Sequence, residues 1–400
     1  MNRHPGRFEH LTKRGSCLLV RSSGPFGCKL GLVVGLAVVL VLCAAALVAC
    51  GEDESTTTEA PATTLGTDTT AGPATTAAAA DDQVYEFKLS LHNPADSPED
   101  QFFDAWAQKV DEATDGRVKV TVFPGAVLGN PTDGLTMVQT GICDILWSYT
   151  GFFPAEFKAN SVLSLPLLLP GTAQENTAVF WDLVESRPEI LEEFESLNLK
   201  LLVYSAGPTA ILGSNKLVAS VDDLKNLQLR VGGGPLTDAV TAWGATPIAM
   251  PPTDLYESLQ KNVIDGYIFD PAGVLPYKVY EPVDYFLDLP FNANPLFTVM
   301  NLDKWNQLPA DLQEVMMTLA GHTASDEFAK VHDTSTGELW SIVEELGRTI
   351  TPATEEIIAG FQPGADEAIA KWETEKTADG IDAAGLVGAV GELVQKNVKK

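Results

Sequence analysis

The side chain with the clearest binding chemistry is Arg230, which lies in the apolar segment Leu227–Val231 just before three consecutive glycines, Gly232–Gly234. A guanidinium presents a planar, rigid set of donors that can bind a carboxylate through two parallel hydrogen bonds. Backbone N–H groups at the start of a following helix would add to such a site. An arginine on the solvent face of an edge strand, or one paired with a nearby acid, would fit the same pattern. The residue types alone leave these alternatives equally open.

A carboxylate and several aromatic side chains follow two other predicted strands. Asp270 ends the segment Val263–Phe269, where it could accept from a ligand hydroxyl or amine, pair with Arg230, or form a turn with the proline that follows it. Four aromatic residues fall within seven positions at the end of the predicted strand Ile142–Trp147, and such groups line pockets for small ligands. The side chains predicted to bind ligand are Arg230, Asp270, Phe269, Trp147, Tyr149, Phe152, His92 and Asn294.

Histidines and sequence motifs give little support for catalysis. Of the five histidines, His92 follows the predicted strand Tyr85–Leu91 and could reach a cleft or form a turn. His322 and His332 fall in a charged helical stretch and are expected at the surface. The chain has no Gly-x-Ser-x-Gly elbow, P-loop or HExxH pattern, and its glycine triplet is not a dinucleotide-binding motif. We therefore expect a protein that is not an enzyme, with no catalytic residues, no metal and no cofactor.

The elements that would position these residues include two segments that resemble each other. Pro131–Asp144 and Pro252–Asp265 share Pro-Thr-Asp, a glutamine and a final aspartate at a constant offset. Each is predicted to form a capped helix, a turn and a buried strand, which indicates two similar α/β lobes. Ligands of open α/β sheets bind beyond the carboxyl ends of the strands, so both lobes should face one cleft. From Pro309 onward, the helical spacing of apolar residues predicts a largely helical C-terminal part.

Charge and cysteine usage limit the classes of partner. The formal net charge is −28, and residues 1–29 carry six basic side chains and one acidic one, so the remainder is more acidic still. A strongly acidic body argues against nucleic acid and anionic membrane surfaces as partners. Cys143 is expected to be a small buried core residue, since the other four cysteines lie at or before position 50.

The N-terminal region is predicted to be a targeting and tethering segment. The apolar run Leu30–Ala49 leads into Cys50-Gly, and its end, Leu-Val-Ala-Cys-Gly, resembles a bacterial lipobox with Cys50 as the lipidated first residue of the mature protein. An uncleaved transmembrane anchor is the alternative, because the run is long enough to span a bilayer. The Thr- and Ala-rich stretch that follows is too polar to fold by itself. The expected organisation is a signal peptide at 1–49, a lipidated tether at 50–82 and a binding domain at 83–400, outside the cytoplasmic membrane.

Residues 84–335 resemble a known family of transport proteins. The segment Ser220–Val231, together with Thr241–Gly266, is similar to the solute-binding proteins of tripartite ATP-independent periplasmic (TRAP) transporters. Further similar motifs occur at Gly116–Val120 and Leu308–Gln313. The resemblance implies a periplasmic-binding-protein-like fold, in which two α/β lobes and connecting helices surround a cleft. The expected lobes are lobe I, at about 83–206 plus 290–335, and lobe II, at about 207–290 plus parts of the C-terminal helices.

The resemblance also implies a function. Proteins of this family close around a small organic acid and deliver it to a membrane permease driven by an ion gradient, and Arg230 matches the family arginine that binds the ligand carboxylate. The second arginine of sialic-acid binders has no counterpart at Gly207–Ile211, and Tyr267–Pro271 departs from many relatives. We therefore expect a monocarboxylate with an apolar or aromatic body as ligand. The protein is expected to be a monomer anchored through Cys50; a ligand sensor that signals to a membrane kinase is the alternative.

Overall fold

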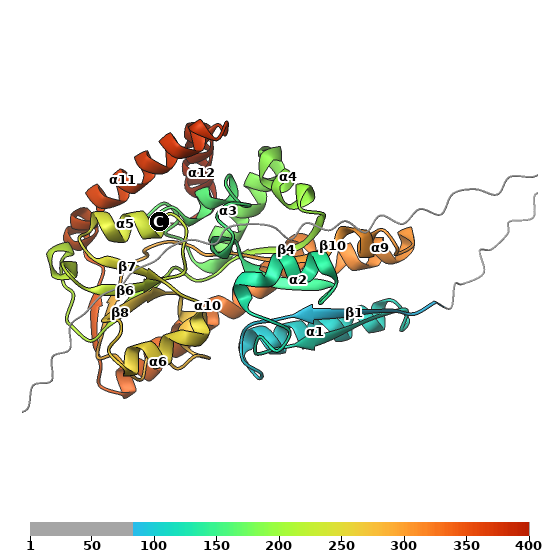
Figure 1. Ribbon diagram of the computed structural model, residues 1–400, viewed down its shortest axis with the longest axis horizontal. Helices are drawn as coiled ribbons and strands as arrows, with labels where there is room; N and C mark the ends of the chain where they lie inside the picture. Colours follow the sequence, from blue (N-terminus) through green and yellow to red (C-terminus); the bar gives the residue numbers. More distant parts are fainter. Residues whose placement is uncertain (1–82, 400) are drawn as a thin grey trace, which may run out of the picture. The chain divides into compact units, whose positions relative to one another are not determined.

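Two β-sheets with helices packed around them form residues 83–399, the part of the chain that this computed structural model describes (Figure 1). All of these residues belong to one compact unit. Within this range, no helix is both long and apolar enough to cross a membrane. The predicted signal peptide, the lipidation site Cys50 and the tether up to residue 82 lie outside the described residues, as does Lys400.

The first sheet has five strands in the order β2-β1-β3-β10-β4. These strands are β1 (Tyr85–Ser90), β2 (Val118–Phe123), β3 (Ile145–Tyr149), β4 (Leu199–Ala206) and β10 (Pro295–Asn301). β1 pairs in parallel with β2 and β3, whereas β10 runs antiparallel to β3 and β4. The carboxyl ends of β1 and β3 therefore lie at the same edge, where His92 and Tyr149 are found.

The second sheet has six strands in the order β11-β9-β5-β8-β6-β7. These strands are β5 (Ile211–Ser214), β6 (Gln228–Val231), β7 (Thr246–Ala249), β8 (Gly266–Phe269), β9 (Tyr285–Asp288) and β11 (Thr349–Pro352). β6 pairs in parallel with both β7 and β8, so the glycine triplet after β6 and Asp270 after β8 lie at one edge. The predicted α/β fold with two lobes is confirmed, and β11 interrupts the C-terminal part that was expected to be largely helical.

Helices cover both sheets. Their bounds are α1 (Pro98–Ala113), α2 (Gly134–Thr140), α3 (Ala173–Ser186), α4 (Pro188–Ser196), α5 (Leu236–Ala242), α6 (Leu255–Gln260), α7 (Pro271–Val274), α8 (Leu302–Trp305), α9 (Ala310–Thr318), α10 (Gly321–Glu345), α11 (Glu355–Ala378) and α12 (Ala383–Asn397). Figure 1 shows α5 and α6 on either side of β6, β7 and β8. The second sheet is therefore covered on both faces, as a mostly buried α/β sheet requires.

The two similar segments form the same local structure in the two sheets. Each begins with a single 3₁₀ turn at its Pro-Thr-Asp and continues into a short helix, α2 or α6. In the first sheet, Asp144 Oδ2 accepts from the backbone N of Lys88 in β1 at 2.9 Å. In the second sheet, Asp265 Oδ2 accepts from the backbone N of Gln228 in β6 at 2.9 Å. Each aspartate thus joins its segment to the neighbouring parallel strand, which gives a structural reason for the shared residue type.

The strands of these segments start later than predicted. β3 begins at Ile145 rather than at Ile142, and β8 begins at Gly266 rather than at Val263. Ile142 and Val263 are 46% and 54% exposed, because each directly follows a residue in the left-handed conformation at which the chain is still turning. The apolar residue type alone does not distinguish such a turn from a strand. Cys143 is fully buried, as expected.

The long helix α10 connects the cores of the two sheets. It packs against β4 of the first sheet, against β11 of the second sheet, and against α7. Phe328 belongs to the core of the first sheet, and Leu339 belongs to that of the second. The buried residues between and around them recur at helical spacing: Ala324, Ser325, Phe328, Ala329, His332, Ser335, Leu339 and Val343. One face of α10 is therefore buried along most of its length.

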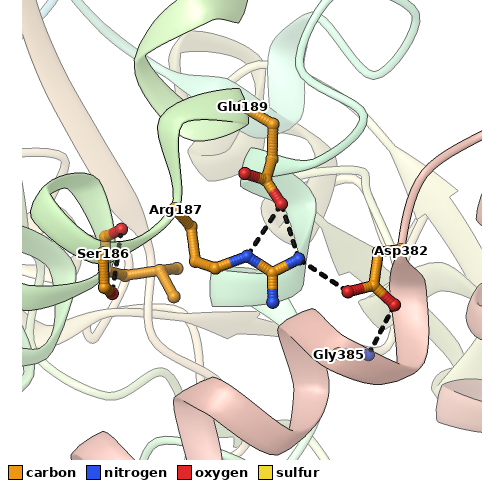
Figure 2. Close-up of polar contacts among 6 residues, drawn as sticks. Ser186, Arg187, Glu189, Asp382 and Gly385 are labelled. Carbon is orange, nitrogen blue, oxygen red and sulfur yellow. Dashed lines mark hydrogen bonds and ion pairs between the residues drawn. The ribbon is translucent and has the colours of Figure 1, made fainter.

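The C-terminal helices also link the two sheets. In α11, Phe361 packs in the core of the second sheet and Trp372 in that of the first. Figure 2 shows how the start of α12 is held: Arg187, between α3 and α4, lies 2.6 Å from Glu189 and 3.0 Å from Asp382. These partly exposed ion pairs contribute little each, so the apolar packing of α12 on α3 supplies most of the stabilisation.

Candidate ligand-binding site

A cavity lies where strands of both sheets end. Residues after β1, β6 and β8 line it, together with the end of β3, the segment before β10 and one residue of α10. All eight side chains that the sequence predicts to bind ligand line this cavity. The structure therefore brings together residues that are up to two hundred positions apart, and their contact with a ligand stays a prediction.

Arg230 is a buried arginine on an interior strand. It lies in β6 between β7 and β8 and is 2% exposed, so the alternative of a solvent-facing arginine on an edge strand is wrong. Its Nε donates to the backbone oxygen of Met250 at 3.0 Å, the only hydrogen bond that its guanidinium forms with the described residues. Its Cζ lies 4.5 Å from the ring centroid of Phe269. Burial lowers the pKa of Arg230 from 12.5 to about 10, although Asp270 acts in the opposite direction, and the side chain stays charged.

Asp270 directly follows β8 and caps the short helix α7. Its Oδ1 accepts from the backbone N of Gly273 at 2.8 Å, and its Oδ2 accepts from Nδ2 of Asn294 at 2.8 Å. It forms no ion pair with Arg230 within the described residues, so the predicted turn-forming role is the one seen here. Burial raises the pKa of the Asp270 carboxyl, and the bond from Gly273 opposes this shift. Because Asn294 precedes β10, its bond to Asp270 joins the two sheets at the cavity.

Aromatic rings form the wall contributed by the first sheet. The ring centroids of His92 and Trp147 lie 4.5 Å apart, and those of His92 and Phe152 lie 5.7 Å apart. Tyr149 contacts Phe152 edge to face at 5.4 Å. Burial, with the charge of Arg230 as a second cause, lowers the pKa of His92 to about 3. His92 is therefore a neutral ring at physiological pH, and this wall is apolar in character.

Two close contacts cross the cavity from one sheet to the other. The hydroxyl of Tyr277, beyond α7, donates to the backbone oxygen of His92 at 2.9 Å. Gly233, after β6, has a φ of +101° and approaches Gly151 so closely that a Cβ there would lie 2.7 Å from the Gly151 carbonyl oxygen. Only glycine allows this backbone to come so near. The two sheets are thus in direct contact around the cavity, as expected for a closed arrangement.

The prediction that His332 lies at the surface is wrong. This side chain is 0% exposed and lines the cavity. Its Nδ1 lies 3.3 Å from the backbone oxygen of Ala206, and its Nε2 lies 3.6 Å from Oε1 of Glu99. The reason is that His332 follows Phe328 by one helical turn and so shares the buried face of α10. His322 is exposed beside Glu185, at 2.9 Å, as predicted.

Several polar lining residues are not among the predicted ones, including Glu99, Tyr277 and Asn292. Glu99 lies in the first turn of α1, a position where exposed acids are common because they interact favourably with the helix dipole. In this protein it is 1% exposed. Its burial depends on α10 packing beside α1, a long-range contact that no local pattern reveals. For the part of the cavity formed by Glu99 and His332, the only sequence signal was the spacing of His332 from Phe328, which places both on one face of α10.

Two α/β lobes that enclose a cavity with a buried arginine and an aromatic wall define a bilobal solute-binding protein. Residues 89–375 match the model of the family described as bacterial extracellular solute-binding protein, family 7. The chain therefore belongs to this family, that of the solute-binding proteins of TRAP transporters.

Similar structures and relatives agree with this assignment. A TRAP solute-binding protein from Rhodoferax ferrireducens T118, in complex with copurified benzoate, aligns with a TM-score of 0.74 at 21% identity, covering 78% of this chain and 98% of that one. A marine metagenome TRAP solute-binding protein specific for aromatic acid ligands, with 3-hydroxybenzoate, aligns with a TM-score of 0.75 at 22% identity, covering 79% of this chain and all of that one (100%). At these identities the likeness establishes a shared fold.

A relative by sequence is the 2,3-diketo-L-gulonate-binding periplasmic protein of Escherichia coli (strain K12). It is 28% identical over 212 residues, which cover 52% of this chain and 63% of that protein. The match thus spans less than two thirds of the relative's length.

Proposed function

We propose that this protein captures a small organic carboxylate outside the cytoplasmic membrane and delivers it to an ion-gradient-driven TRAP permease. The observation that carries the proposal is Arg230. A charged guanidinium is 2% exposed, lines a cavity, and within residues 83–399 hydrogen-bonds to the protein only through its Nε.

The physical reason is the cost of burying a charge. Removing a guanidinium from water is unfavourable unless hydrogen bonds and an opposite charge compensate for the lost hydration. The nearby acid, Asp270, directs its oxygens to Gly273 and Asn294 instead. A ligand carboxylate would complete the arginine's hydrogen bonding in the bidentate manner that favours arginine over lysine.

The walls of the cavity favour a ligand with an apolar or aromatic body. His92 is neutral, Trp147 and Phe152 line the same cavity, and the ring of Phe269 lies 4.5 Å from Cζ of Arg230. The two structurally similar proteins named above contain benzoate and 3-hydroxybenzoate, which are aromatic monocarboxylates. We propose an aromatic monocarboxylate for this chain on the combination of the arginine and these rings.

Capture would occur by closure of two lobes, each built on one sheet, with lobe I at about 83–206 plus 290–335 and lobe II at about 207–290 plus parts of the C-terminal helices. The contacts of Tyr277 with His92 and of Gly233 with Gly151 belong to the closed state in this account. A protein that closes on its ligand as a single chain needs no second copy, and we propose a monomer. Light scattering after size-exclusion chromatography would contradict this if it gave twice the chain mass.

A thermal-shift screen tests the proposed function. The protein without its N-terminal region should be stabilised by some members of a library of aromatic and aliphatic carboxylates, because a ligand that binds only the folded form raises its stability by mass action. The best carboxylate should then be taken up by cells that express the protein together with its permease, and not by cells that express the permease alone. Stabilisation by neutral sugars and by no carboxylate would refute the proposal.

Anchoring through Cys50 is proposed from the lipobox-like sequence alone. Replacing Cys50 with alanine should release the protein from the membrane fraction, whereas Cys43→Ala, in the same apolar run, should leave it there. Membrane attachment that survives Cys50→Ala would support the uncleaved anchor instead.

A further inference from the structure

We infer that the cavity contains a second polar subsite, formed by Glu99 and His332, that selects carboxylates carrying an ammonium group away from the carboxylate. The inference rests on the proposed function, because it concerns the other end of the ligand that Arg230 would hold. It narrows the ligand class from aromatic monocarboxylates to aromatic amino acids in the broad sense, in which ring, carboxylate and amine belong to one molecule.

No structural role of Glu99 within residues 83–399 explains its burial. The start of α1 is already capped: Ser97 Oγ accepts from the backbone N of Asp100 at 3.2 Å, and Asp100 Oδ2 accepts from that of Asp96 at 2.9 Å. Glu99 is 1% exposed, and its Oε2 has no hydrogen-bond partner in the described part of the protein. A buried carboxylate oxygen without a hydrogen-bond partner is costly, so a donor that binds here would relieve that cost.

Two other groups that line the cavity with Glu99, on His332 and Asn292, also offer acceptor atoms without donors among the described residues. His332 is 0% exposed and its Nε2 has no hydrogen-bond partner within residues 83–399. When Nδ1 of the neutral ring carries the proton, as its 3.3 Å approach to the Ala206 oxygen favours, Nε2 is an acceptor. Asn292 Oδ1, on the same cavity, is buried and unpartnered as well. An ammonium group, which has three donors and no acceptor, matches such a set of acceptors.

The charges that line the cavity also favour a ligand with an ammonium group. The charged or titratable lining groups are Arg230, Asp270, Glu99, His332, His92, Tyr149 and Tyr277. Both tyrosines are neutral, because burial raises the pKa of each, and His92 is neutral because its pKa is about 3. Two carboxylates therefore face one guanidinium, and at most one further positive charge if His332 is protonated.

A simple carboxylate ligand would make this balance worse. With Asp270 and Glu99 both ionised, its charge would leave the cavity with an excess of negative charge whether His332 is neutral or protonated. A ligand that is itself neutral overall, with a carboxylate at Arg230 and an ammonium at Glu99, adds no net charge and supplies the missing donors. Unpaired buried charge is strongly unfavourable, so the cavity should discriminate between these two ligand types.

Pairs of ligands that differ only at the amine test the inference. The probes are 3- and 4-(aminomethyl)benzoate against 3- and 4-ethylbenzoate, all measured by calorimetry. At least one ammonium compound should bind about tenfold or more tightly than its methyl counterpart, as expected for a charge-assisted hydrogen bond in a buried site. Equal or weaker binding of every ammonium compound would overturn the inference.

Variants show whether the preference depends on the proposed subsite. Glu99→Gln keeps the side-chain shape and should remove most of the preference for the ammonium compound while the binding of ethylbenzoate is kept or improved. Glu327→Gln, at a surface ion pair with Lys109, is the matched control and should change neither. His332→Gln is the second variant and should reduce the preference even if Glu99→Gln does not fold, with folding checked by circular dichroism. A preference that persists in both variants would overturn the inference.

The results separate this inference from the proposed function. Suppose that carboxylates bind and that Arg230→Lys weakens their binding, but that the protein does not prefer the ammonium compounds. The proposed function then stands and the second subsite does not. If no carboxylate binds at all, both fail.

Discussion

The hydroxyl of Tyr277 donates to the backbone oxygen of His92 at 2.9 Å, and this bond ties the second sheet to the first beside the cavity. Tyr277 follows α7, and His92 follows β1. Both residues also line the cavity. The bond therefore holds the two lobes together beside the His92 ring, which is part of the cavity wall. It is absent from any arrangement in which the lobes are apart.

Removing this bond should weaken ligand binding. Tyr277→Phe deletes the hydroxyl and keeps the ring, so the closed state loses one hydrogen bond worth roughly 1 kcal/mol. We expect the Kd for the best carboxylate to rise by about fivefold to tenfold in calorimetry. Tyr256→Phe, which removes an exposed hydroxyl bonded to Glu281, is the control. A Tyr277→Phe protein that binds as tightly as the control would show that the bond does not contribute to closure.

Close approach of the backbones at Gly233 gives a second prediction. A Cβ on Gly233 would lie 2.7 Å from the Gly151 oxygen, and φ there is +101°. Gly380 has a comparable φ of +88° and no atom within 4 Å of such a Cβ. Both alanine substitutions should lower the free energy of unfolding by about 1 kcal/mol or more, but only Gly233→Ala should also weaken ligand binding. Equal affinities in the two variants would argue against contact of the lobes at this point.

The buried histidine His92 should make stability fall at acidic pH. Its pKa is about 3 in the folded protein, against an ordinary 6.5, so between these values the unfolded chain binds a proton that the folded one does not. The stabilisation is therefore present above pH 6.5 and is lost as pH falls toward 3, with a slope approaching ~1.4 kcal/mol per pH unit.

Urea unfolding of wild type and His92→Gln at several pH values measures this effect. The stability difference between the two proteins should shrink as pH falls from about 7 to about 4. Asp270 acts in the opposite direction, because its raised pKa favours the folded state as pH falls through that pKa, but it is present in both proteins. A difference that does not change with pH would contradict a neutral, buried His92.

The matched aspartates predict parallel effects on stability. Asp144→Asn and Asp265→Asn each weaken a charge-assisted bond to a strand backbone N, at an expected cost of about 1 to 3 kcal/mol in the free energy of unfolding. Asp254→Asn, at an exposed position of the second segment, should have little effect. If one of the two matched substitutions were neutral, the shared residue type would need another explanation.

The sequence predicted those residues of the cavity that have a local sequence signal, and it missed those that depend on long-range contacts. Arg230 and the rings near Tyr149 and Phe269 were found because each lies at the end of a strand, and strand ends of α/β sheets gather ligand-binding groups. Glu99 was missed because an acid in the first turn of a helix is normally exposed. Its burial requires α10 to cover α1, a contact more than two hundred residues away in sequence.

The same reasoning applies to the fold. The paired segments predicted two α/β lobes, because their shared residues meet the same local demands in each sheet. Their strand starts were misplaced at Ile142 and Val263, since an apolar residue in a turn looks like the first residue of a strand. His332 was misplaced because its charged neighbours suggested a surface helix, whereas its spacing from Phe328 placed it on the buried face of α10.

Calorimetry of Arg230→Lys with the best carboxylate from the screen tests the central claim most directly. Lysine keeps the charge but loses the planar pair of donors, so the Kd should rise by about tenfold or more. Arg117→Lys, at an ion pair with Asp311 in the first lobe and away from the cavity, should leave the Kd unchanged. If Arg230→Lys bound the carboxylate as tightly as Arg117→Lys, the account of Arg230 as the carboxylate-binding residue would be wrong.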